Sequence, residues 1–102
     1  MNHAPTGVAT IVDALRIRDL LGLVDDICHR RGVTRDELCG AVRTRAICRA
    51  RQEAWWRIRH LPGHDYSYQE IGKLFGRDHT TILHGVHVYA LLSAAEPTQA
   101  AP

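Results

Sequence analysis

The feature of this sequence that most constrains its fold is a pair of helix-start signals separated by one glycine. Ser67 and Glu70 have the spacing of a capping box, in which side-chain oxygens accept hydrogen bonds from the free backbone N–H groups of a helix N-terminus. Gly76 can adopt the positive φ that ends a helix, and Asp78 is a typical N-cap for the helix that follows. Two helices joined by so short a connection predict a helix-turn-helix.

Helical signals also dominate the rest of the chain, and no alternating strand pattern spans six residues. Apolar spacing, caps and stop signals predict helices over 11–31 (with a break near Gly22), 34–40, 44–61, 67–76 and 78–94. A chain of 102 residues has room for one domain. We therefore expect an all-α compact domain of five helices, or six with the break, over residues 10–94, with flexible tails at 1–9 and 95–102.

Positive charge is concentrated in one segment. The net charge is only +2, but residues 43–60 alone sum to +5. A helix over 44–61 would separate an apolar face (Ile47, Ala50, Ala54, Ile58 and Leu61) from a basic face (Arg45, Arg49, Gln52 and Arg59). A concentrated basic patch suits a phosphate backbone, although a solvated helix face can have the same composition.

The sequence does not show what packs against two apolar features. Trp56 falls within the basic face, where it can pack beneath the first helix or contact another molecule. The last helix carries an apolar stripe on the side away from its expected core residues: Val88, Leu91 and Leu92. Either residues 11–21 cover this stripe, or a second copy of the chain or another protein does.

The sequence gives little support for a catalytic or a metal-binding function. His84 and His87, with His79 one turn earlier, lack the further ligands of a tetrahedral metal site. His60 and His64 are not paired with a nucleophile. We therefore expect no enzyme, cofactor or metal.

Cysteine spacing and hydropathy indicate the compartment. The three cysteines lack C-x-x-C spacing and are interpreted as reduced thiols in the core. No run of about 18 apolar residues and no signal peptide occurs, so we expect a cytoplasmic, nucleoid-associated protein without membrane contact.

Residues 71–84 identify a family. Their sequence, I-G-K-L-F-G-R-D-H-T-T-I-L-H, closely resembles the signature of the C-terminal DNA-binding domain (domain IV) of the bacterial replication initiator DnaA. The upstream Arg43-x-Arg45 and Ala50-Arg51-Gln52 also look like that family. The resemblance implies an all-helical, Trp-repressor-like fold whose helix-turn-helix reads a short asymmetric box in double-stranded DNA.

The resemblance also implies roles for individual residues. Those facing the major groove would be Asp78, His79, Thr80 and Thr81. Arg43 would enter the adjacent minor groove, which attracts arginine where it is narrow and rich in A·T pairs. Those holding the phosphate backbone would be Arg45, Arg51, Gln52 and Arg59.

Three departures from the family are visible. Gly76 stands alone where the family usually has two glycines, and Gln69 replaces a common proline. No phosphate-binding G-x-x-x-x-G-K-[ST] occurs, so the sequence lacks the initiator's ATPase motif.

We therefore expect a stand-alone bacterial or phage protein that binds a DnaA-like box and regulates transcription or modulates replication. The alternatives are a protein-binding module that keeps the fold, and a non-specific nucleoid-associated DNA binder.

Overall fold

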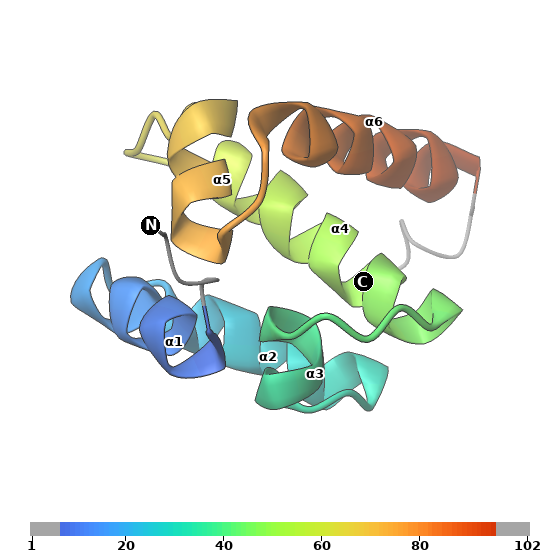
Figure 1. Ribbon diagram of the computed structural model, residues 1–102. Coiled ribbons are helices and arrows are strands. Elements are labelled where there is room, and N and C mark those ends of the chain that lie inside the picture. The colour runs from blue at the N-terminus through green and yellow to red at the C-terminus, as the bar shows by residue number, and fades with distance from the viewer. Residues whose placement is uncertain (1–6, 96–102) are drawn as a thin grey trace.

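Six helices make up residues 7–95, the part of the chain that the computed structural model describes (Figure 1). They are α1 (Val8–Ile17), α2 (Leu21–Arg31), α3 (Arg35–Cys39), α4 (Arg45–Arg59), α5 (Tyr68–Phe75) and α6 (His79–Ala95). This span contains no strand. The expected all-α class and the helix-turn-helix, formed by α5 and α6, are confirmed.

The first helical stretch breaks at Asp19 rather than near Gly22. Asp19 has a positive φ of 61°, which aspartate tolerates better than most residues, whereas Gly22 lies inside α2. The break brings Leu20 into the core, where its side chain is 1% exposed. Helix α1 also begins at Val8, inside the segment predicted to be a tail. The predicted tails otherwise lie almost entirely outside the described residues.

The predicted caps form as the sequence indicated. The Ser67 hydroxyl accepts from the Glu70 N–H at 3.0 Å, and the Glu70 carboxylate accepts from the Ser67 N–H at 2.8 Å. Thr34 and Glu37 make the same reciprocal pair at the start of α3. These boxes satisfy backbone donors that would otherwise lack partners at the helix N-termini.

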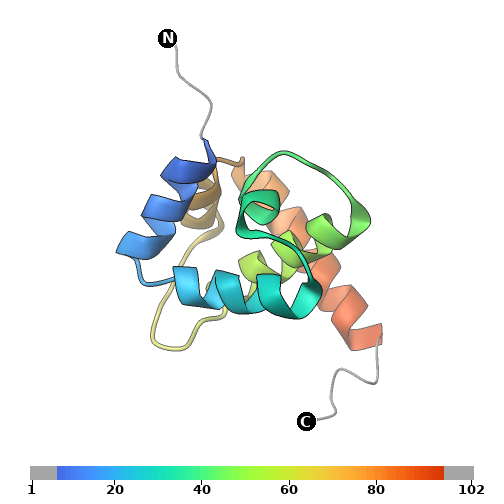
Figure 2. The ribbon, with the colours of Figure 1, turned by 90° about the horizontal axis from the view of Figure 1, so that it is seen from below.

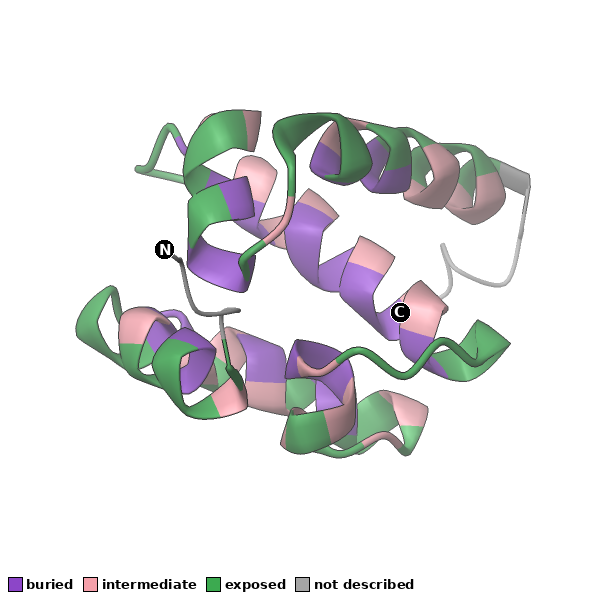
Figure 3. Cartoon of the chain, viewed as in Figure 1, coloured by how far each residue is buried: buried purple, intermediate pink, exposed green. Residues whose placement is uncertain are grey.

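Helix α4 runs through the centre of the molecule. It lies between a layer formed by α1, α2 and α3 and a layer formed by α5 and α6 (Figures 1 and 2), and beside it α1 packs directly against α5. Buried residues recur along most of its length in Figure 3. The largest fully buried side chains come from all six helices and the α1–α2 connection: Ile11, Leu15, Leu20, Val24, Ile27, Leu38, Ile58, Ile71 and Ile82.

Trp56 packs against α6, not beneath the first helix. Its ring centroid lies 5.7 Å from that of Tyr89 and 4.5 Å from that of His60. Helix α1 packs against α2, α3 and α5, and it lies on the other side of α4 from α6 (Figure 1). Residues 11–21 therefore do not cover the late stripe of α6, in which Leu91 is 73% exposed and Val88 and Leu92 are half-buried.

A buried carboxylate joins α2 to α4. The Glu53 side chain is 5% exposed and accepts hydrogen bonds from Arg30 at 2.6 Å and Arg31 at 2.5 Å. Burial raises the pKa of Glu53, but the hydrogen bonds from the two arginines lower it, and the net pKa lies below its ordinary value. Glu53 therefore stays ionised, and its charge is balanced by the two guanidinium groups.

We expect Glu53→Gln to destabilise the fold by about 2 kcal/mol at neutral pH, since hydrogen bonds to charged groups contribute about 1.5–3 kcal/mol. Because the folded pKa is depressed, this contribution is present above the unfolded pKa of glutamate and is lost as the pH falls through the folded pKa. Urea unfolding from pH 7 to pH 3 measures the difference between wild type and variant, which should shrink in acid.

Asp13→Asn is the matched control, because Asp13 forms an ion pair with Arg16 whose two side chains are 66% and 60% exposed. It should change the unfolding free energy little at any pH. A Glu53→Gln difference that stays constant down to pH 3 would contradict the ion-pair explanation.

Candidate nucleic-acid interface

The turn between α5 and α6 is held tightly by two glycines. Gly76 has a φ of 66°, the left-handed conformation that its position at the end of α5 requires. A Cβ atom on Gly72 would lie 2.4 Å from the carbonyl oxygen of Arg77, so only glycine lets the turn backbone pack on α5. The predicted role of Gly76 is confirmed. Gly72 has to be small because the backbone of the turn packs directly against it.

The N-terminus of α6 presents four exposed side chains: Asp78, His79, Thr80 and Thr81. Asp78 caps the helix, because one carboxylate oxygen accepts from the Thr80 hydroxyl and from the Thr80 N–H at 2.9 Å. These hydrogen bonds lower the pKa of Asp78, so the carboxylate is ionised. Its other oxygen lies 3.8 Å from His79 Nδ1, beyond hydrogen-bond distance. Capping therefore leaves one oxygen free to accept another hydrogen bond.

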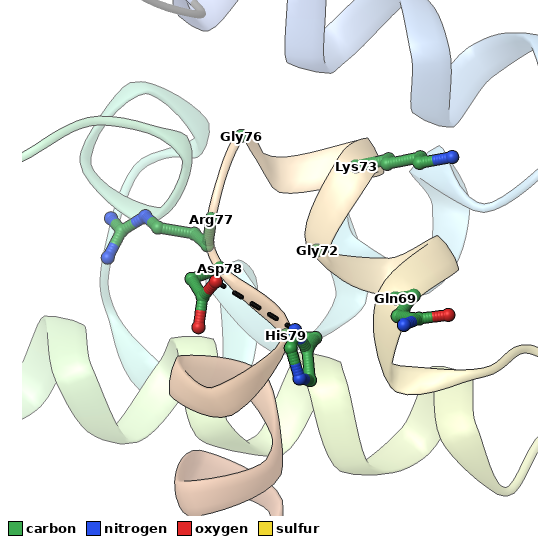
Figure 4. A pocket seen from close by; sticks show the side chains of 7 residues that line it. All are labelled: Gln69, Gly72, Lys73, Gly76, Arg77, Asp78 and His79. Atoms are coloured by element: carbon green, nitrogen blue, oxygen red, sulfur yellow. Dashed lines mark ion pairs between the residues drawn. The ribbon is translucent and has the colours of Figure 1, made fainter.

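A depression lies over the turn, and Figure 4 shows its lining. Gln69 and Lys73 project from α5, His79 projects from the start of α6, and Asp78 lies between the helices. Arg77 extends to the opposite side of the turn from Gln69 and Lys73 (Figure 4). The depression is therefore bordered by both helices of the helix-turn-helix.

The loop between α3 and α4 lies beside the start of α6. Arg43 is exposed in this loop, and it lines one cleft together with Thr81 and His84 of α6. Gln52 of α4 lines the same cleft, and its Oε1 is buried without a hydrogen-bond partner among the described residues. The structure thus places the predicted minor-groove residue in the same cleft as Thr81, one of the predicted major-groove residues.

The remaining predicted phosphate contacts lie along α4 at intervals of seven residues: Arg45, Gln52 and Arg59. Arg45 is exposed at the start of the helix. Arg59 is half-buried, with its guanidinium 5.0 Å from the centre of the Tyr68 ring and 3.9 Å from the Asp65 carboxylate. A seven-residue interval corresponds to nearly two helical turns, so the three side chains share one face of α4.

Arg51 differs from the sequence-based expectation. Its side chain is 2% exposed and donates to the backbone carbonyls of Leu38 at 2.8 Å, Glu37 at 2.9 Å and Gly40 at 2.8 Å. Burial lowers the pKa of its guanidinium. Arg51 therefore satisfies carbonyls at the C-terminal end of α3 and is not exposed for a phosphate. Its spacing from Ile47 and Ala54, four residues before and three after, places it on the apolar face and could have indicated burial.

Sequence reasoning missed Arg77 and His84 as parts of this surface. Arg77 is half-buried and donates to the Gly40 carbonyl at 3.0 Å. No local pattern could reveal this contact, because the two residues are 37 positions apart. His84 lines the cleft three residues after Thr81, a helical spacing that could have identified it.

Within residues 7–95, no three histidine, cysteine or acidic side chains come close enough together to hold a metal ion. In the same span, no helix has both the length and the apolar character needed to cross a membrane.

We expect Arg51→Lys to lower the melting temperature by several degrees. A lysine ammonium cannot reproduce the planar fork that serves three carbonyls, and an unsatisfied buried carbonyl costs about 1–3 kcal/mol. Arg45→Lys is the matched control at an exposed position and should leave the melting temperature unchanged. An Arg51→Lys variant with wild-type melting and weakened DNA binding would restore the phosphate-contact role.

Comparisons with known proteins place the chain in a family. The family of bacterial DnaA protein helix-turn-helix domains matches residues 23–88. Relatives include the chromosomal replication initiator protein DnaA of Thermomicrobium roseum, 38% identical over 96 residues, which cover 84% of this chain and 20% of the relative. The DnaA of Deinococcus radiodurans is 35% identical over 83 residues, covering 81% and 17% of the two chains. That of Dechloromonas aromatica is 53% identical over 51 residues, covering 49% and 10%.

No solved structure matches the chain significantly. These matches cover only 10% to 20% of the length of the three initiator proteins. The helix-turn-helix is a DNA-binding motif, and the family match spans α4, α5 and most of α6, so DNA binding is the activity that the family supports. The chain belongs to the family of bacterial DnaA helix-turn-helix domains.

Proposed function

We propose that this chain binds double-stranded DNA sequence-specifically and reads a box of the DnaA type through two neighbouring grooves. The observation that carries the proposal is the cleft in which Arg43 of the α3–α4 loop and Thr81 of α6 lie together. In a helix-turn-helix the N-terminal residues of the second helix meet base edges in the major groove. A basic side chain beside that helix can then reach the adjacent minor groove.

The N-terminus of α6 has suitable chemistry for base edges. The free oxygen of Asp78 can accept a hydrogen bond from cytosine N4, while its other oxygen caps the helix. The Thr80 hydroxyl is held by Asp78, which leaves the methyl group as the apolar surface for a thymine methyl. Thr81 is exposed and lines the same cleft as Arg43. Asp78 thus caps the helix with one oxygen and reads a base with the other.

The phosphate contacts that we propose are Arg45, Gln52 and Arg59 along α4. Contacts to the backbone carry no sequence information, but they fix the register of the protein on the duplex. Arg51 is left out of this set, because its guanidinium is buried against α3.

The biological role that we propose concerns the part of the longer relatives that this chain matches. Those proteins are named as chromosomal replication initiators, and the matches cover only a tenth to a fifth of their length. We propose that this chain supplies box recognition, through which it regulates transcription or modulates replication.

A second candidate is a protein-binding module, acting as a homodimer or on another protein. The observation that favours it is the late stripe of α6, where Leu91 is 73% exposed. Trp56 is half-buried by Tyr89 and His60 and borders the same end of α6. This candidate does not require the N-terminus of α6.

Fluorescence anisotropy tests the proposed function on a duplex with a DnaA-type box and on a scrambled duplex, each at two salt concentrations. We expect a preference of tenfold or more for the box, which corresponds to about 1.4 kcal/mol. Arg43→Ala and Thr81→Ala should each reduce that preference. Arg16→Ala, on the exposed surface of α1, is the control for loss of one positive charge.

The other outcomes select among the alternatives. Equal, strongly salt-dependent binding to both duplexes would indicate a non-specific binder. An absence of binding at low salt would favour the protein-binding module, and sedimentation of wild type and Leu91→Asp would then test self-association.

Substitution of Asp78 separates its two roles. Asparagine is an equally good N-cap, so we expect Asp78→Asn to keep the wild-type melting temperature. Removing the carboxylate charge beside the DNA should strengthen binding to the scrambled duplex and reduce box preference severalfold. Asp78→Ala should reduce preference and also lower the melting temperature. If Asp78→Asn keeps the full preference, Asp78 acts only as a cap.

A further inference from the structure

The loop that carries Arg43 is anchored at both ends. It joins α3 to α4 over residues 40–44, and residues 41–46 are exposed. At one end, the Thr44 hydroxyl accepts from the Ile47 N–H at 3.2 Å and caps α4. At the other end, the Gly40 carbonyl accepts from two guanidinium groups. The position of Arg43 therefore depends on what holds Gly40.

The two donors to Gly40 come from different parts of the fold. Arg51 of α4 donates at 2.8 Å, and Arg77 of the helix-turn-helix donates at 3.0 Å. Their positive charges repel, and after burial this repulsion is the main cause that lowers the pKa of Arg51. The Gly40 carbonyl thus connects the Arg43 loop to the central helix and to the turn that precedes α6.

The backbone of Arg77 is itself fixed. Its N–H donates to the Gly72 carbonyl at 2.8 Å, and its own carbonyl packs against Gly72, where no Cβ could fit. Its guanidinium lies 6.0 Å from the centre of the buried Trp55 ring. Figure 4 shows the side chain on the far side of the turn from Gln69 and Lys73. Arg77 is therefore directed at the protein and links the turn between α5 and α6 to the α3–α4 loop.

We propose that Arg77 is a positioning residue for DNA recognition: it holds the loop carrying Arg43 in register with the N-terminus of α6. The inference rests on the proposed two-groove function, because only that function requires a fixed distance between the two segments. Without the Arg77 side chain, the loop keeps its Arg51 anchor but loses the one side-chain hydrogen bond that, within residues 7–95, joins it to the helix-turn-helix. Arg43 then samples positions that miss the minor groove.

A double-mutant cycle on the box duplex tests the proposal. Arg77→Met removes the donor and keeps an apolar stem over Trp55. We expect it to weaken box binding about tenfold in the wild-type background and less than twofold in Arg43→Ala, since the loop then carries nothing to position. Lys73→Met is the matched control, because Lys73 borders the same turn but points away from the loop. Its effect should be equal in both backgrounds.

A direct phosphate contact predicts a different pattern. Arg77→Met would then weaken binding equally in both backgrounds and reduce the salt slope by about one in each. That additive result would overturn the positioning role while leaving the two-groove function intact. If Arg43→Ala alone has no effect on box binding, the proposed function fails and the inference fails with it.

Measurements on the free protein provide a second readout. In Arg77→Met, NMR order parameters of the Val42 and Arg43 amides should fall, while those of α6 stay at wild-type values. Arg77→Lys, which keeps the charge but loses the planar fork, should give a smaller fall of the same kind. Unchanged order parameters in both variants would overturn the proposal. Melting temperatures identify any variant that fails to fold, and Arg77→Lys then serves in the cycle.

Discussion

The buried guanidinium of Arg51 is the contact on which the arrangement of this domain depends. It binds three carbonyls at the end of α3 and so attaches the α1–α3 layer to the central helix. Burying a cation is costly unless its donors are satisfied, and here the acceptors are three backbone carbonyls at the C-terminal end of α3. The Arg51 side chain thereby provides hydrogen-bond partners for its own buried guanidinium and for the carbonyls at the end of α3. It also fixes the position of Gly40, where the Arg43 loop begins.

This contact changes how the basic segment is understood. The excess of positive charge over residues 43–60 suggested one surface for phosphates. In the structure, Arg51 is internal and Arg57 lies near Asp26 and Glu53, at 3.4 and 3.6 Å. Of the arginines proposed to contact DNA, Arg43 and Arg45 are exposed and Arg59 is half-buried. Recognition would thus depend more on where these side chains stand than on total charge.

Local signals predicted the helices well, and long-range contacts escaped them. The capping boxes at Thr34 and Ser67 depend on neighbours within one turn, so the sequence shows them directly. The break in the first helical stretch was predicted near Gly22 but lies at Asp19, where the chain turns so that Leu20 enters the core. The exposed start of α6 followed from the motif. The bond from Arg77 to Gly40 joins distant positions and has no counterpart in spacing or composition.

The short turn with its single glycine has a consequence for how this domain can change over evolution. The turn length sets where the Arg77 backbone lies, and the Arg77 side chain has to reach Gly40 across a fixed gap. An insertion in the turn moves that side chain away from its acceptor unless the α3–α4 loop changes as well. The α3–α4 loop and the α5–α6 turn are separated in the sequence by the whole of α4 and α5. Changes in the length of one therefore require compensating changes in the other.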